Sequence, residues 1–212
     1  MMRKALRTAT ALALAIPLLA AAQPASASST FLYRDNGSFA DAFFEGPGTP
    51  GDLPGNYSVA WLTFHSSDLA EGWVDTFACK DGETPWGDEN GENGCRSTGS
   101  YYAWGEDLTV VSGKGKGASS TYSGTVDLYD ATTEDGDVVA VDVPFQVTLT
   151  PTGATSRSTY TDTYRDPESG VTYRFRETRV YNYATVQGSF DGVPAVDGSV
   201  GTYSVRQMER IA

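Results

Sequence analysis

From residue 28 onward, apolar and polar residues alternate along most of the chain, which is the pattern of half-buried β-strands. In segment 120–130 the apolar positions include Val126 and Leu128, and segment 137–149 continues the alternation through odd-numbered valines. We predict roughly ten strands and almost no helix. The remaining predicted strands are 31–34, 57–64, 73–79, 100–104, 107–112, 155–165, 171–186 and 201–208.

A first hairpin is predicted to join 120–130 to 137–149 through a turn at 133–136. This register places Val126 opposite Val141, so that the apolar side chains of both strands share one face. Pro144 cannot donate a ladder hydrogen bond, which indicates a bulge or an edge strand at that point.

A second hairpin is predicted to join 155–165 to 171–186. Its turn, 166–170, contains a proline and a glycine, which suit the backbone angles of a tight turn. The register places Asp162 opposite Tyr173. Together the strands predict a single antiparallel β-sandwich or β-barrel domain, and alternation alone does not separate the two.

The first 27 residues have a different pattern. A basic head is followed by an apolar run over 9–22 and then by Ala25-Ser26-Ala27. This is the organisation of a secretory signal peptide, and the run is shorter than the ~20 residues that span a bilayer. We predict cleavage between Ala27 and Ser28, which leaves 28–212 as a secreted, extracellular domain with no further membrane span.

Charge is distributed unevenly. The whole chain has a formal charge of −12, and loss of the three cations in the signal segment makes it −15. Residues 28–156 contain 20 acidic side chains against 5 lysines and arginines, whereas 157–212 contain 7 of each. Such a surface disfavours nucleic acid and anionic membranes as partners and permits a cationic partner.

The two cysteines, Cys79 and Cys95, predict a disulfide in an exported chain. Between them Asp88, Asn90 and Glu92 present oxygen ligands on alternate positions among glycines, as calcium requires. The spacing is not that of an EF-hand, so the alternative is a solvated acidic loop held by the disulfide. No other cofactor is predicted.

Candidate catalytic groups are few. With one histidine, His65, the sequence disfavours hydrolytic triads and a catalytic zinc. A pair of carboxylates, Glu177 and Asp162, falls on one face of the second hairpin, where it would suit glycoside hydrolysis. The alternative is a strand surface of structural ion pairs, because arginines lie close to Glu177 in sequence.

Aromatic residues cluster as Tyr101, Tyr102 and Trp104, with Trp86 in the cysteine loop. Exposed rings of this kind hold sugars on many β-domains, although aromatic residues also build strand cores. The leading prediction is a secreted, non-enzymatic binding module for a glycan, a cell-envelope ligand or a cationic partner. The alternatives are a small secreted glycan hydrolase that uses paired carboxylates, and a structural envelope protein without a ligand site.

Overall fold

The computed structural model describes residues 29–65, 68–87, 94–115, 117–133 and 136–210. The predicted cleavage site, Ala27 and Ser28, lies outside the described residues. So do the candidate calcium ligands Asp88, Asn90 and Glu92. Among the described residues, no helix has the length and apolar character needed to cross a membrane.

The described chain is all-β, as predicted, and every strand pairing is antiparallel. One 3-10 turn, η2 (Pro50–Asp52), interrupts the strands. The strands are β1 (Ser29–Pro47), β2 (Tyr57–His65), β3 (Ala70–Cys79), β4 (Cys95–Gly105), β5 (Thr109–Ser112), β6 (Ser120–Asp130), β7 (Val138–Arg165), β8 (Thr172–Phe190) and β9 (Val193–Arg210).

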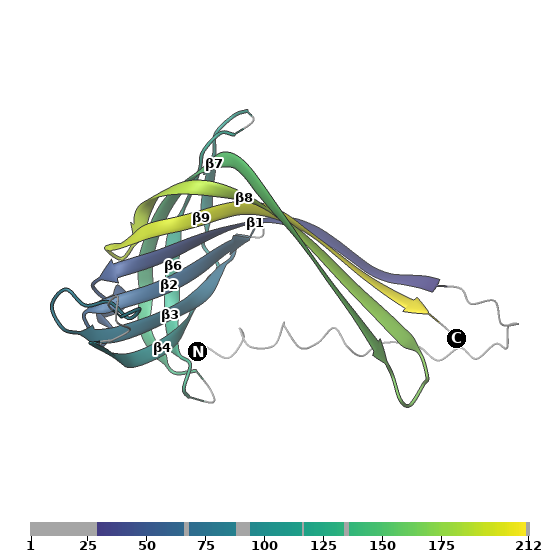
Figure 1. Ribbon diagram of the computed structural model, residues 1–212, viewed down its shortest axis with the longest axis horizontal. Coiled ribbons are helices and arrows are strands. Elements are labelled where there is room, and N and C mark those ends of the chain that lie inside the picture. Colours follow the sequence, from purple (N-terminus) through teal and green to yellow (C-terminus); the bar gives the residue numbers. More distant parts are fainter. Residues whose placement is uncertain (1–28, 66–67, 88–93, 116, 134–135, 211–212) are drawn as a thin grey trace, which may run out of the picture.

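The sheet closes on itself. Its strand order is β4-β3-β2-β1-β9-β8-β7-β6-β5, and β4 also pairs with β6, so that eight strands form a ring (Figure 1). The short strand β5 pairs with the other half of β6. Of the two architectures that alternation allows, the pairing is therefore that of a barrel, closed between β4 and β6 over Tyr101–Trp104.

Apolar side chains fill the barrel interior because alternate residues of each strand point inward. Strand β1 contributes Ala40, Ala42 and Phe44, and β2 contributes Leu62 and Phe64, all buried. Other fully buried members of the core are Val74, Val126, Leu128, Val147, Leu149, Phe190 and Val193. The odd-numbered residues of β1 and β2 consequently lie on the outer surface of the barrel.

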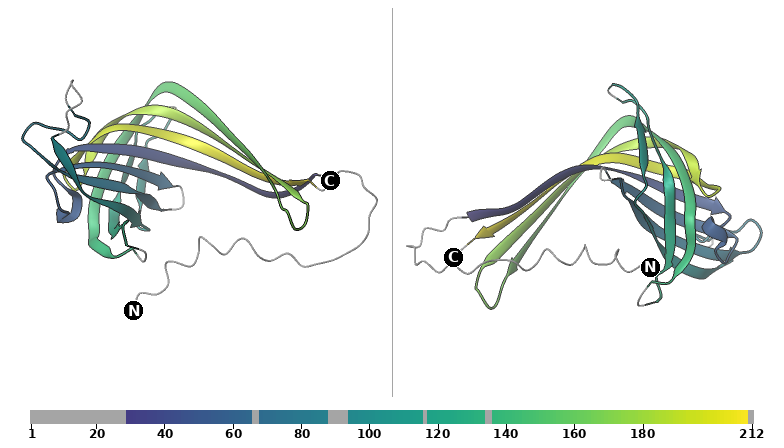
Figure 2. Two further views of the ribbon diagram at one scale, coloured as in Figure 1. Left: turned by 60° about the horizontal axis from the view of Figure 1, so that its bottom comes forward. Right: turned by 180° about the vertical axis from the view of Figure 1, so that it is seen from behind.

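Four strands continue beyond the barrel as an arm. Strand β2 pairs with β1 only over Phe39–Pro47, whereas β1 pairs with β9 from Ser29 onward. Likewise β7 leaves β6 after Leu149 and runs with β8 to Arg165. Figures 1 and 2 show the parts of β1, β9, β8 and β7 outside the barrel extending away from it as one twisted sheet. The inward-facing and outward-facing positions of β1 and β9 therefore continue onto the two faces of the arm.

The described residues form nine strands, against roughly ten predicted. The predicted strands 137–149 and 155–165 are one strand, β7, and β1 extends well past the predicted 31–34. In the first hairpin Val126 pairs with Val143, not Val141, because the register shifts twice along β7, between Val138 and Ala140 and again at a bulge beside Asp142. That bulge confirms the prediction from Pro144. In the second hairpin Asp162 pairs with Phe175, a shift of two residues that preserves the predicted faces.

Candidate functional site

A row of aromatic residues crosses five neighbouring strands on the outer surface of the barrel. The strand register pairs each ring with the next. We call this set the aromatic row: Phe43 on β1, Trp61 on β2, Trp73 on β3, Tyr102 on β4 and Tyr129 on β6. Directly opposite residues in antiparallel strands lie within about 5.5 Å of one another, so the row forms a continuous strip.

Trp61 and Tyr102 are more than half exposed, at 53% and 52%. Between them, Trp73 packs against Tyr102 in a T-shaped arrangement with the ring centroids 4.5 Å apart. Trp73 Nε1 donates a 2.8 Å hydrogen bond to Oδ1 of Asp75, which fixes the orientation of the indole. The row therefore offers both free ring faces and a carboxylate beside them.

The row runs into a groove of about 430 Å³ where the arm leaves the barrel. Phe43 and Trp61 belong to both features, and tyrosines from β8 line the groove as well. The lining residues are Asp41, Phe43, Trp61, Ser156, Tyr181, Tyr183, Asp197, Gly198 and Ser199. Aromatic side chains thus accompany two carboxylates, which is the composition of many ligand sites: apolar surface with a few oriented polar groups.

The polar groups of the groove are held by their neighbours. Asp41 Oδ1 accepts a 2.8 Å hydrogen bond from Thr63 Oγ1, and its Oδ2 accepts one of 3.3 Å from Ser199 Oγ. Asp197 Oδ1 accepts a 2.7 Å hydrogen bond from the backbone nitrogen of Gly198. Since a carboxylate has about four acceptor positions, both groups retain capacity for the hydroxyl or ammonium donors of a ligand.

A small cluster on the outer surface supports the arm side of the groove. Phe39 is buried outside the barrel core because Gly201, its partner on β9, leaves room for the ring. Tyr181 packs edge-on against Phe39, with centroids 5.3 Å apart, and Arg179 lies 5.9 Å above the same ring. Glu177 pairs with Arg179, and this hydrogen bond holds the pKa of the guanidinium above its ordinary value. Tyr181 is therefore fixed by packing before any ligand arrives.

The predicted aromatic cluster divides between the two sides of the wall. Tyr102 and Trp104 are exposed on the outer surface, but Tyr101 is only 5% exposed and belongs to the core. Trp86 is 65% exposed and lies in the cysteine loop. Only Tyr102 of these four is part of the aromatic row.

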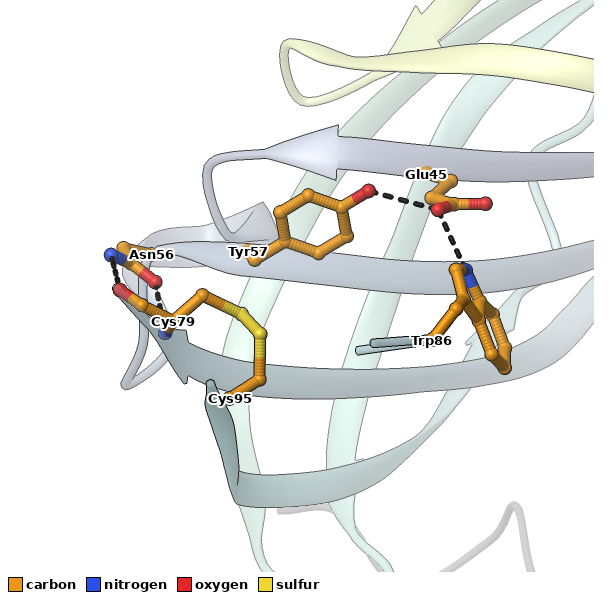
Figure 3. Close-up of a disulfide and its surroundings, with 6 residues drawn as sticks. All are labelled: Glu45, Asn56, Tyr57, Cys79, Trp86 and Cys95. Carbon is orange, nitrogen blue, oxygen red and sulfur yellow. Dashed lines mark hydrogen bonds between the residues drawn. A yellow bond between two sulfur atoms is a disulfide. The ribbon is translucent and has the colours of Figure 1, made fainter. Parts of the chain in front are cut away.

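The disulfide between Cys79 and Cys95 is confirmed and joins directly opposite residues of β3 and β4 (Figure 3). Asn56 hydrogen-bonds both backbone groups of Cys79, and Oε1 of Glu45 accepts hydrogen bonds from both Tyr57 and Trp86. The described start of the loop is thus attached to β1. No cluster of three metal-ligating side chains occurs in the described part of the chain, and the calcium site stays a prediction.

The predicted catalytic carboxylates lie on the arm, outside the residues that line the groove. Glu177 faces Tyr160 across the strands and is paired with Arg179. Asp162 accepts a hydrogen bond from the backbone nitrogen of Thr163. The two carboxylates share a face, as predicted. Hydrolase activity is still a prediction from the sequence. It can be tested by comparing polysaccharide hydrolysis by the wild type and by Glu177→Gln. His65 binds Glu71 at 2.9 Å.

Sequence reasoning missed the groove because β1 was predicted to stop at residue 34. With β1 extended to Pro47, alternation places Asp41, Phe43 and Glu45 on one face, and this pattern is visible in the sequence. That Phe43 lies opposite Trp61 depends on the register between β1 and β2, which only the fold supplies.

Comparisons with known proteins do not identify a family. No family model matches the chain, and no curated protein matches it. Among solved structures, the chain aligns with outer membrane protein AlkL, determined by solid-state NMR in DMPC lipid bilayers. The alignment has 11% identity and a TM-score of 0.19, and covers 92% of this chain and 97% of that chain. A TM-score this low carries no argument about fold or function.

Proposed function

We propose that the chain is exported and acts outside the cell as a carbohydrate-binding protein, with the groove and the aromatic row as its binding surface. The observation that carries the proposal is the register of the row. Five aromatic residues lie opposite one another across five strands, and two of them line a groove that also contains Asp41 and Asp197.

The chemistry of the surface indicates the class of sugar. Flat aromatic rings match the apolar faces of pyranose rings, while carboxylates accept hydrogen bonds from hydroxyl groups. Asp41 and Asp197 would repel an anionic sugar and attract an amino sugar. Four strand spacings of about 4.8 Å give the row a length of about 19 Å, which suits an extended oligosaccharide more than a monosaccharide.

The test is a binding measurement on the protein that begins at Ser28. Three probes of similar length are compared by titration calorimetry: neutral cello-oligosaccharides, cationic chitosan oligosaccharides and anionic oligogalacturonates. We expect binding of a neutral or cationic probe and none of the anionic one. Trp61→Ala should weaken binding at least tenfold, because an aromatic anchor at a binding surface is commonly worth about 2 kcal/mol.

The matched control is Tyr164→Ala, since Tyr164 is as exposed as Trp61, at 58% against 53%, but lies on the arm. It should bind as the wild type does. Equal affinity of the wild type and Trp61→Ala would reject the surface, and binding of the anionic probe alone would reject the ligand class. If Glu177→Gln abolished a hydrolytic activity instead, the hydrolase would replace the binding protein.

A further inference from the structure

One face of the arm carries a row of arginines. Arg34 on β1 is paired with Arg206 on β9, and Arg206 is paired with Arg176 on β8. All three are exposed. Directly opposite side chains point to the same face of a sheet, so the three arginine side chains emerge side by side, with neighbouring Cβ atoms about 5 Å apart.

The same face collects further cations and no described carboxylate. Arg174 precedes Arg176 by two residues, and the partners of Arg165 and Arg157 on β8 are Thr172 and Val180, which share the parity of Arg176. We call this set the arginine face: Arg34, Arg157, Arg165, Arg174, Arg176 and Arg206. Between residues 34 and 206, its other members include serines, threonines, Asn36 and Val180.

The carboxylates of the arm lie elsewhere. Asp35, Asp162 and Glu177 occupy positions of the opposite face, and Asp166 and Glu168 lie in the hairpin turn. Both ion pairs among the described residues, His65 with Glu71 and Arg179 with Glu177, leave the arginine face out. Like charges directly opposite one another destabilise a sheet, so this face gains stability from any anionic surface that covers it.

The complementary charge on this chain is on the barrel. Residues 28–156 hold 20 acidic side chains against 5 cations. Asp68, Glu106 and Asp107 are exposed at the end of the barrel that adjoins the arm. There the backbone of Leu108 donates a hydrogen bond to the carbonyl of Asp68, and Ala70 is paired with Gly105. We call these three carboxylates the acidic rim.

We propose that the arginine face is a docking surface for the acidic rim of a second copy of this chain. The arm continues the barrel wall through four unbroken strands, and in the folded molecule its arginines form no ion pair with the described barrel carboxylates. Two copies related by a two-fold axis would satisfy both surfaces twice, because each arm would cover the other's rim. Guanidinium groups suit the contact, since they pair with carboxylates in bidentate geometry.

The test is sedimentation equilibrium of the protein that begins at Ser28, up to roughly 100 μM, where weak interfaces are populated. The wild type should dimerise at about 20 mM salt and dissociate at about 500 mM, where charges are screened within a few ångströms. Arg176→Gln/Arg206→Gln should weaken dimerisation at least tenfold, because each copy loses two partly exposed ion pairs and the symmetric dimer contains both sets.

Arg96→Gln/Lys114→Gln is the matched control, because it removes the same charge from exposed barrel positions. It should dimerise at least as well as the wild type. Glu106→Arg/Asp107→Arg should fail to dimerise alone but associate when mixed with Arg176→Glu/Arg206→Glu. Circular dichroism of each variant confirms folding, which exposed substitutions should leave intact.

Two results would overturn the proposal. One is a wild type that stays monomeric at low salt over the whole concentration range. The other is a dimer that Arg176→Gln/Arg206→Gln does not weaken. If the monomer instead bound polyphosphate, and the same double substitution removed that binding, the arginine face would serve a polyanion and not a second copy. The result of the dimerisation test does not depend on sugar binding, because the groove opens on the opposite face of the sheet.

Discussion

The indole nitrogen of Trp86 donates a 2.7 Å hydrogen bond to Oε1 of Glu45, and so attaches the cysteine loop to strand β1 across 41 residues of sequence. The indole remains 65% exposed, so the contact positions the loop more than it buries apolar surface. The carboxylate lies two residues from Phe43 on the same face, which places the loop's attachment point beside the proposed sugar surface.

Trp86→Phe keeps an aromatic ring but removes this donor. We expect amide exchange in residues 80–87 to accelerate while the barrel strands are unaffected, with a loss of global stability under about 1 kcal/mol. Hydrogen exchange followed by mass spectrometry measures both. Trp104→Phe, at an exposed position outside the loop, should leave exchange in 80–87 unchanged, and an equal acceleration in both variants would contradict the anchoring role.

Tyr57 should titrate late. Burial, and secondarily its hydrogen bond to Glu45 and the charge of that carboxylate, raise its pKa to about 12. Because the folded value exceeds the unfolded value near 10, the contribution to stability is intact below pH 10 and is lost as the pH rises toward 12. Burial also raises the pKa of Tyr122 and of Tyr129. Absorbance at the tyrosinate band should therefore show a delayed component that Tyr57→Phe reduces, and Glu45→Gln should shift part of it closer to 10. Ionisation of every tyrosine near 10 would refute it.

Loss of the disulfide should destabilise the barrel mainly through the unfolded chain. Cys79 and Cys95 are separated by 16 residues, and a loop of that length contributes about 3 kcal/mol in the chain-entropy account. Urea unfolding of Cys79→Ser/Cys95→Ser should show this loss, with the native ladder between β3 and β4 retained. A loss of unfolding free energy below about 0.5 kcal/mol would mean that residual structure already restricts the unfolded chain when the disulfide is absent.

Gly201 has a steric role at the arm side of the groove. A Cβ there would meet Cζ of Phe39 at 2.5 Å and the carbonyl oxygen of Val180 at 2.7 Å. Gly201→Ala should therefore cost about 1–3 kcal/mol by overpacking, and should displace Tyr181 and weaken sugar binding. Thr202→Ala, at the exposed neighbouring position, is the control for thermal unfolding. Equal melting temperatures of the two variants would show that Phe39 and its neighbours move aside for the added Cβ without loss of stability.

Several parts of the fold follow from residue patterns, and several do not. The strand class, the disulfide and the bulge near Pro144 could be predicted because each depends on local chemistry. Val139 and Val141 alternate with the buried Val143, yet both are exposed, at 41% and 62%. The bulge beside Asp142, where φ is 54°, shifts the inward position to Ala140, and alternation alone does not locate such a shift.

The aromatic row, too, could not be predicted from residue patterns alone, because it depends on strand register. Trp73 and Tyr102 are conspicuous in the sequence, but their opposition to one another and to Trp61 depends on three registers at once. Register is set by loops and bulges distributed over the whole barrel. The composition of the site could therefore be predicted, but not its geometry.

The ladder between β1 and β9 ends with Ser29 opposite Arg210, at the far end of the arm. A short linker between these two positions would make the backbone circular without passing over the barrel. New termini could then be opened in the exposed turn between β5 and β6, where Gly113 donates a hydrogen bond to Ser119. In topological terms this is a fold whose chain order can be permuted while its ring, groove and arm stay the same.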